Sequence, residues 1–150
     1  MGEKAALKEI KVIVFQLLDK EYAIPVSQVH SIEKIQQITR VPRVERYVKG
    51  VINLRGVVTP IIDLRSRFDL LPQEQTDNTR VIIVNIEGME VGLVVDSAND
   101  VLDIPLEIIE PQPEVVGGIE AEYISGVAKI EKRLLILLHL DKVLISNKAG

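Results

Sequence analysis

The chain of 150 residues contains no cysteine and no tryptophan, and its aromatic residues are limited to three tyrosines and two phenylalanines. Without cysteine the protein has no disulfide framework, no thiolate metal site and no thiol nucleophile. The net charge is −4 at pH 7, and the sequence shows neither a basic face nor an aromatic stacking platform. Proteins that bind nucleic acid usually carry one or the other, so we expect no nucleic-acid partner.

Long hydrophobic segments are also missing. No apolar run approaches the roughly 20 residues of a membrane span, so we expect no direct insertion into a membrane. The first ten residues, MGEKAALKEI, lack the apolar core of a signal peptide, which predicts a cytoplasmic protein. No glycine-rich phosphate loop follows a predicted strand, and no Gly-x-Ser-x-Gly motif occurs. We therefore predict a protein without cofactor, metal ion or catalytic activity.

The titratable residues leave more than one interpretation open. His30 and His139 have apolar neighbours and no ligand partner at metal-binding spacing, which favours ordinary packing. Helix capping explains Asp63, Asp96 and Asp100 most simply, although an acid–base pair among them stays open. An enzyme or small-molecule binder would need such groups to converge, and the sequence shows no convergence.

Hydrophobic residues make up 47% of the chain, and valine and isoleucine form short runs such as VIVF, VIIV and VGLVV. Runs of β-branched residues of this length are typical of buried strands, so the sequence predicts a mostly β fold. Because side chains alternate across a strand, Val12–Phe15 cannot all face one side. Either some of them are exposed for protein contacts, or the second half of the chain covers them.

The sequence contains an internal repeat in two pieces. Ala23–Val29 matches Gly92–Ala98, and Tyr47–Val51 matches Tyr123–Val127 at a slightly larger offset. The second half is longer than the first between the two matched pieces, and the extra residues fall within residues 104–122, which are rich in proline, glutamate and glycine. We expect this segment to be a long surface loop.

Each half of the repeat predicts the same elements: two strands, a helix-capping residue (Ser27 or Asp96), a loop, a hairpin and a short amphipathic helix. Halves of this size are marginally stable alone. We therefore predict two small closed β-barrels that pack around a shared core, with Gly50 and Gly126 at equivalent positions. The polar stretch Leu71–Thr79 is the predicted linker.

The hairpin tips distinguish the two halves. The first tip, Asn53–Gly56, contains Arg55, whereas Glu131 occupies the matching position in the second half. Gly56 can adopt the positive φ that a tight turn requires, and Asn53 can bond the backbone of its own turn. Arg55 is then either a solvated turn residue or a guanidinium, held on a rigid hairpin, that binds a partner's carboxylate or carbonyl groups.

The stretch YVKGVINLRGVVTPIIDL, Tyr47–Leu64, resembles the hallmark motif of the CheW family of bacterial chemotaxis coupling proteins. Similar stretches include EYAIPVSQVHSI, TRVPRVERYVKG, VGLVVDSANDVL and EYISGVAKIEKRLLILLHLDKVL, so the likeness runs from about Val12 to Leu144. It implies a mostly β fold of two SH3-like five-stranded β-barrel subdomains. A pseudo-twofold would relate them around a shared core, with short helices at the subdomain ends.

The same resemblance implies the extent of the domain. One CheW-like domain would cover about residues 10–145, with subdomains at about 10–72 and 80–145 that can exchange strands. Residues 1–9 and 146–150 would be terminal extensions.

The resemblance also implies a function. Members of this family are non-catalytic adaptors that couple the cytoplasmic tips of methyl-accepting chemotaxis receptors to the regulatory domain of the histidine kinase CheA. The receptor then controls autophosphorylation of the kinase, and the adaptor is recruited to membrane-associated receptor arrays. The chain is too short to contain the phosphotransfer and ATP-binding domains of a kinase as well. An alternative is a CheW-like scaffold of another receptor–kinase signalling array.

Transfer of the family's contacts onto matching positions implicates two sets of residues. The receptor contact would lie near the hairpin motif and use Ile32, Lys49, Gly50, Asn53, Arg55 and Val81. The kinase contact would use an apolar rim formed by Ile13, Val26 and Val29. Ser31 stands where some relatives carry an acidic residue.

Overall fold

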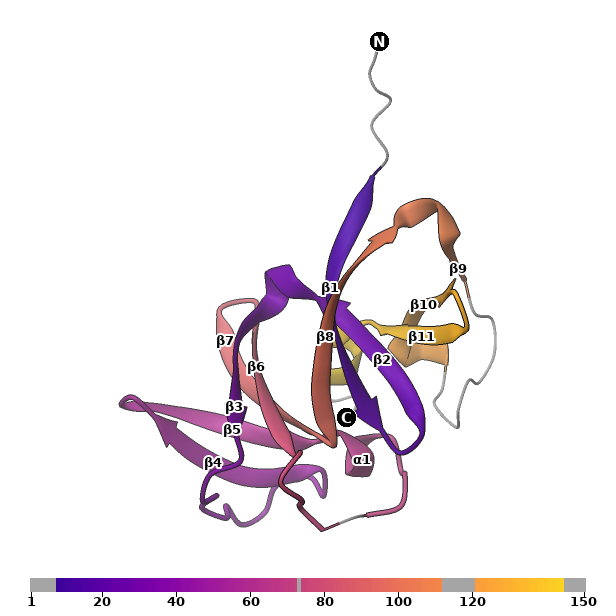
Figure 1. Ribbon diagram of the computed structural model, residues 1–150. Helices are drawn as coiled ribbons and strands as arrows, with labels where there is room; N and C mark the ends of the chain where they lie inside the picture. Colours follow the sequence, from indigo (N-terminus) through magenta and orange to yellow (C-terminus); the bar gives the residue numbers. More distant parts are fainter. Residues whose placement is uncertain (1–7, 73, 112–120, 145–150) are drawn as a thin grey trace.

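The computed structural model describes residues 8–72, 74–111 and 121–144, which form two β-sheets with short helical turns (Figure 1). Sheet A has six strands in the order β8 (Ser97–Pro105), β1 (Glu9–Leu17), β2 (Lys20–Pro25), β11 (Arg133–Leu138), β10 (Ile124–Ile130) and β9 (Ile109–Glu110). Sheet B has five strands in the order β3 (Val29–Lys34), β6 (Arg80–Ile86), β7 (Met89–Val95), β5 (Val57–Asp63) and β4 (Val48–Leu54). The mostly β prediction is confirmed.

The helical segments are short, and all except the last lie between strands. The 3-10 turns are η1 (Val26–Gln28), η2 (Leu106–Ile108) and η3 (Ala121–Tyr123), and the α-helices are α1 (Leu64–Arg67) and α2 (Leu140–Leu144). Asp63 caps α1, because its Oδ1 accepts a hydrogen bond from the amide of Arg65 at 3.1 Å. The cap predicted at Ser27 is wrong: η1 begins after Pro25 and has no side-chain cap.

The two halves of the sequence exchange their first hairpins. The hairpin β1–β2 joins sheet A, where β2 pairs in parallel with β11, and the hairpin β6–β7 joins sheet B, where β7 pairs in parallel with β5. Residues 10–72 and 80–145 therefore do not correspond to the two sheets. Each sheet combines strands from both halves, so neither half can complete its sheet alone.

Strand register confirms the internal repeat. In sheet B, Ile61 of β5 lies opposite Gly92 of β7; in sheet A, Leu137 of β11 lies opposite Ala23 of β2. The two offsets of the sequence repeat carry Ala23 onto Gly92 and Ile61 onto Leu137, so these pairs are equivalent. Gly126 pairs with Leu137 just as Gly50 pairs with Ile61, in each case next to a register shift.

Two tyrosines mark the same equivalence. The carbonyl of Tyr47 accepts a hydrogen bond from the amide of Asp63 at 2.8 Å, and that of Tyr123 accepts one from His139 at 2.9 Å. The guanidinium carbon of Arg67 lies 4.6 Å from the centroid of the Tyr47 ring and 4.9 Å from that of Tyr123. These cation–π contacts bring equivalent parts of the two halves together around one side chain.

The hydrophobic runs of β1 and β6 are buried on both faces. Val12 and Val14 belong to a core within sheet A, whereas Ile13, Phe15 and Leu17 belong to the core shared by the two sheets. On β6, Val81 and Ile83 line a third core within sheet B, and Ile82 and Val84 face the shared core. The alternative left open by the sequence is thereby settled, because the second half of the chain covers the VIVF run.

The predicted closed barrels are not observed in the described residues, since no strand pairing there joins the two ends of either sheet. In sheet B the segment after β3 approaches β4 through a single bridge, with hydrogen bonds of 2.8 Å between Thr39 and Val51 in both directions. In sheet A, η2 leads from β8 directly to β9, which pairs with β10.

Residues 104–122 are only in part the loop that the sequence predicts. Residues 104–110 complete β8 and form η2 and β9, because Ile104 and its neighbours pack into the core within sheet A. Residues 112–120, like most of the predicted terminal extensions, lie outside the described residues.

We predict that Gly50 tolerates no side chain. Its φ is +145°, and a β-carbon built on it would lie 2.1 Å from the carbonyl oxygen of Thr39. Overlap with backbone adds to the strain of the φ value, so Gly50→Ala should lower the free energy of unfolding by about 3 kcal/mol. Urea denaturation measures this change.

Gly88 is the matched control. Its φ is +83°, but a β-carbon there would meet no atom within 4 Å. Gly88→Ala should therefore cost only about 1 kcal/mol, which reflects the left-handed conformation alone. Equal losses from the two substitutions would contradict the close approach of residues 39 and 50.

Candidate functional site

The tip of the β4–β5 hairpin presents the predicted contact residue Arg55. Arg55 and Gly56 both have positive φ values, 51° and 86°, as two-residue hairpin turns of this type require. The Oδ1 atom of Asn53 accepts a hydrogen bond from the amide of Gly56 at 2.8 Å, which confirms the local role predicted for Asn53. The turn therefore holds Arg55 on a defined backbone, with 73% of its side chain exposed.

Arg55 has a partner that the sequence did not predict. Its Nη2 atom lies 3.7 Å from Oε2 of Glu33 on β3, and the Glu33 side chain is only 18% exposed. This ion pair joins β3 to the β4–β5 turn, on the side of sheet B where the Thr39–Val51 bridge links the segment after β3 to β4. At this length and exposure it contributes little stability, and most of the guanidinium surface stays accessible.

The other residues of the predicted receptor set separate into exposed and buried ones. Ile32 and Lys49 are exposed. Val81 is 1% exposed within the core of sheet B, and Gly50 is buried under residue 39. Both residues are therefore buried and not exposed at the surface, and Val81 packs against β4, the strand that carries Lys49 and leads to Arg55.

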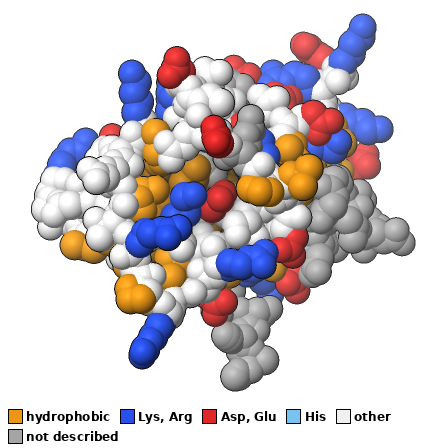
Figure 2. Space-filling view, turned by 90° about the horizontal axis from the view of Figure 1, so that it is seen from below, with side chains coloured by type: hydrophobic (Ala, Val, Ile, Leu, Met, Phe, Trp, Pro, Cys, Tyr) orange, Lys and Arg blue, Asp and Glu red, His pale blue; other side chains and the backbone are white. Residues whose placement is uncertain are grey.

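Lys49 lies where two surface hollows meet. The larger, of about 1060 Å³, is lined mainly by residues 36–49 and by the segment that follows α1. The smaller, of about 450 Å³, lies between β1, α1 and β7, and Lys49, Asp63 and Gln75 border both. Figure 2 views the molecule from the lower side of Figure 1 and shows Lys and Arg side chains next to hydrophobic ones on this face.

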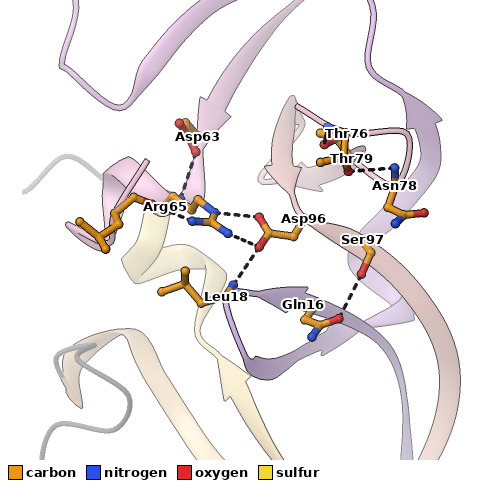
Figure 3. Close-up of polar contacts among 10 residues, drawn as sticks. Gln16, Leu18, Asp63, Arg65, Thr76, Asn78, Thr79, Asp96 and Ser97 are labelled. Atoms are coloured by element: carbon orange, nitrogen blue, oxygen red, sulfur yellow. Dashed lines mark hydrogen bonds and ion pairs between the residues drawn. The ribbon is translucent and has the colours of Figure 1, made fainter. Parts of the chain in front are cut away.

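A buried ion pair forms part of the wall of the smaller hollow (Figure 3). Arg65 of α1 donates hydrogen bonds to both carboxylate oxygens of Asp96, the one from Nε at 2.8 Å, and a third from Nη1 to the carbonyl of Leu71 at 2.7 Å. The amide of Leu18 donates to the same carboxylate at 2.8 Å. The hydrogen bonds to the Asp96 carboxylate raise the pKa of Arg65. Through Asp96 and the Leu18 amide, α1 is tied to both exchanged hairpins. Asp96 is therefore no helix cap, contrary to the prediction.

The predicted kinase set lies at the junction of the two sheets. Ile13 is only 7% exposed and belongs to the shared core, so its assignment to an exposed rim is corrected. Val26 and Val29 are half-buried and pack against the same core. Val101, 56% exposed, pairs with Ile13 across β1 and β8, and the sequence analysis missed it. The first offset of the sequence repeat places Val101 at the position equivalent to Ile32, and this match could have drawn attention to it as a candidate contact residue.

His30 and Asp100 form ion pairs, whereas His139 is exposed. His30 Nδ1 lies 3.5 Å from Oε2 of Glu90, and Asp100 accepts a hydrogen bond from Arg133 at 2.9 Å, so Asp100 is not a cap either. Across the described ranges no group of three or more His, Asp or Glu side chains could hold a metal ion. None of the described helices has the length and hydrophobicity needed to cross a membrane.

Comparison with known proteins defines the class of this two-sheet domain. Residues 11–148 match the model of the CheW-like domain. A chemotaxis protein CheW of Bacillus subtilis is 52% identical, covering 89% of this chain and 86% of the relative. A chemotaxis protein CheW of Klebsiella aerogenes is 39% identical, with 91% and 82% covered.

A solved structure agrees with these relatives. The scaffolding protein TtCheW of Thermoanaerobacter tengcongensis superposes with a TM-score of 0.87 at 34% identity, covering 93% of this chain and 95% of that one. The chain belongs to the CheW family of chemotaxis scaffold proteins.

We predict that the Arg65–Asp96 pair contributes to the stability of the whole domain. Asp96→Ala removes the carboxylate that accepts hydrogen bonds from Nε and Nη2 of Arg65 and from the Leu18 amide, so the free energy of unfolding should fall by about 3 kcal/mol. Asp103→Ala, which removes an exposed pair with Lys11, should change it by less than about 0.5 kcal/mol. If chemical denaturation gave equally small losses of unfolding free energy for Asp96→Ala and Asp103→Ala, Arg65 would have found another acceptor.

Proposed function

We propose that this chain is a non-catalytic chemotaxis adaptor that couples methyl-accepting receptors to the regulatory domain of the kinase CheA. Family membership supports this function, and the exposed Arg55 on its rigid hairpin carries the proposal because a guanidinium binds carboxylate or carbonyl groups in a fixed geometry. In this proposal the protein works in the cytoplasm and is recruited to membrane-associated receptor arrays.

The receptor surface consists of the exposed members of the predicted set: Ile32, Lys49, Asn53 and Arg55. They come from β3, β4 and the β4–β5 turn; β3 and β4 are the edge strands of sheet B, and the Arg55–Glu33 ion pair and the Thr39–Val51 bridge link these two edges. An apolar Ile32 beside polar and cationic groups suits a helical partner with an apolar stripe and acidic or carbonyl groups next to it.

The kinase surface consists of Val26 and Val29, with Val101 added from the structure. All three border the shared core, since Val26 and Val29 pack on it and Val101 lies beside its member Ile13. Apolar side chains that remain exposed at the edge of a core are typical of protein contacts.

We also propose that each sheet, together with the segment that approaches its last strand, is an open form of the SH3-like barrel.

Arg55→Ala tests the receptor contact. If a receptor group pairs with Arg55 in a desolvated interface, the loss costs on the order of 2–5 kcal/mol of binding free energy. Receptor-dependent kinase autophosphorylation, measured with receptor-containing membranes, should therefore fall at least about tenfold. The thermal midpoint should stay near that of the parent, because the pair with Glu33 is long and exposed.

Two control variants separate the alternatives. Glu33→Gln removes the internal partner of Arg55, and Glu131→Ala changes the equivalent turn residue, which also has a positive φ of 58°. Both should keep near-parental activation. If Glu33→Gln impaired activation as much as Arg55→Ala, the guanidinium would act through its internal ion pair and not through the receptor.

A further inference from the structure

Residues 40–49, here called the cationic loop, concentrate positive charge on an acidic protein. The whole chain has a net charge of −4, yet this loop contains four cationic side chains and a single carboxylate, that of Glu45. The cations recur at every third position, as Arg40, Arg43, Arg46 and Lys49. All four are exposed and line the larger hollow. The loop therefore produces a local positive potential that the overall composition conceals.

Neighbouring carboxylates leave most of this charge without a partner. Arg40, Arg43 and Lys49 form no ion pair with any residue that the structure describes. Arg46 reaches Asp69 only at 3.8 Å, with 84% and 85% of the two side chains exposed. A pair of this length and exposure contributes little stability, so it would exchange readily for an anion from outside.

The backbone of the cationic loop is anchored at both ends. Before it, Thr39 and Val51 exchange two hydrogen bonds of 2.8 Å, and at its far end the amide of Val48 donates to the carbonyl of Glu45 at 2.9 Å. Between these anchors Arg43 has a positive φ of 59°, which costs free energy for any residue other than glycine. A strained, exposed residue in an anchored loop is more typical of a binding surface than of a simple connection.

Apolar side chains alternate with the cations of the loop. Val41 is 37% exposed and Val44 is 43% exposed, and both line the hollow together with the half-buried Leu70. Figure 2 shows hydrophobic and cationic side chains side by side on this face. Arginine next to exposed apolar groups is the composition found in protein interfaces, so the surface suits a partner that is both acidic and apolar.

The size and lining of the hollow favour a polypeptide over a small molecule. Its volume of about 1060 Å³ lies at the upper limit of small-molecule sites, which measure roughly 300–1,000 Å³ and are mainly apolar. Here most lining residues are polar or charged. The carboxylates among them include Asp63, which is engaged as the cap of α1, and Asp69 beside Arg46. Among the described lining residues none is aromatic, so nucleic-acid bases would find no stacking platform.

We propose that the cationic loop and the larger hollow form a docking site for an acidic segment of a protein partner, in which apolar residues accompany the carboxylates. The carboxylates would pair with Arg40 and Arg43, whose guanidinium groups bind carboxylates in a fixed fork. The apolar residues of the segment would cover Val41 and Val44.

This site goes beyond the receptor and kinase surfaces of the proposed function. Lys49 and Arg55 are six residues apart along β4 and its turn, which at 3.3 Å per residue separates them by about 20 Å. Val26 and Val29 lie before and at the start of β3, whereas the cationic loop follows this strand. Only Lys49 is shared with the proposed receptor surface, so the variants that test the site leave Lys49 unchanged.

A synthetic acidic peptide, with leucines at every third or fourth position among glutamates, is the probe. Calorimetry with the full chain should give a dissociation constant of about 100 µM or lower, and the affinity should fall as the salt concentration rises. The peptide with lysine in place of glutamate, and an oligothymidylate, should not bind. No binding of the acidic peptide, equal binding of the lysine peptide, or tighter binding of the oligothymidylate would overturn the proposal.

Charge reversal in the loop tests the cations. The double variant Arg40→Glu/Arg43→Glu should bind the acidic peptide at least about tenfold more weakly, with the thermal midpoint near that of the parent because neither side chain has an ion pair in the described structure. Lys129→Glu/Lys132→Glu is the matched control: both lysines are exposed on the β10–β11 hairpin, and the net charge changes equally. Equal losses from the two double variants would reduce the effect to net charge and contradict a site in the loop.

The apolar part of the site has its own test. Val44→Ser should weaken peptide binding about threefold, because part of the side chain is buried on binding. Val58→Ser, at a residue of β5 that is 64% exposed, should leave the affinity unchanged. Parental affinity in both variants would show that the segment does not cover the valines, and the proposed amphipathic partner would be wrong.

Competition separates this site from the proposed function. A saturating receptor cytoplasmic-tip fragment or CheA regulatory domain should leave the affinity for the acidic peptide unchanged. Displacement by either one would assign the hollow to that partner and overturn a separate site. If the parent bound neither partner, the proposed function would fail, whereas the peptide titrations would still decide whether the cationic loop is a docking site.

Discussion

The exchange of the hairpins β1–β2 and β6–β7 is the constraint on which the rest of the structure depends. Each hairpin completes the sheet that is built from the other half of the chain. The strands of these hairpins are therefore covered on both faces, and one shared core connects the two sheets. The Arg65–Asp96 pair and the position of Arg67 between Tyr47 and Tyr123 join the same halves again. Residues far apart in sequence are thereby held in one connected structure.

The two halves have the same fold but different chemistry at equivalent positions. Sheet A places Arg133 between two carboxylates and Glu131 at its hairpin tip, whereas sheet B has Val57 and Arg55 at those positions. In sheet A, Arg133 pairs with Glu21 and Asp100, whereas in sheet B the Arg55 side chain is largely exposed and, among the described residues, the buried Ser31 hydroxyl has no hydrogen-bond partner. The equivalent turn keeps its positive φ with Glu131, so the turn geometry alone does not require the arginine found at position 55.

Local and periodic features of the fold could be predicted from the sequence. The β-branched runs indicated the strands, the internal repeat established the equivalence of Gly50 and Gly126, and Asn53 was assigned its turn bond correctly. The family resemblance allowed an exchange of strands, but the residues themselves could not predict it, because either half could have supplied a partner of the same β-branched composition.

The contact residues were harder to predict than the strands. Ile13 and Val81 were placed at contact surfaces although both are buried, since a strand covered on both faces shows no alternation of polar and apolar residues. The partners of Arg55 and Asp96 depend on how distant strands meet, which no local pattern records.

The central claim is that separate surfaces of one rigid unit bind the receptor and the kinase at the same time. Sedimentation of this protein with a receptor cytoplasmic-tip fragment and the CheA regulatory domain tests it most directly. The account predicts a ternary complex, with the affinity for the regulatory domain undiminished when the receptor fragment is saturating. Mutual displacement of the two partners would contradict it, because both would then occupy a single surface.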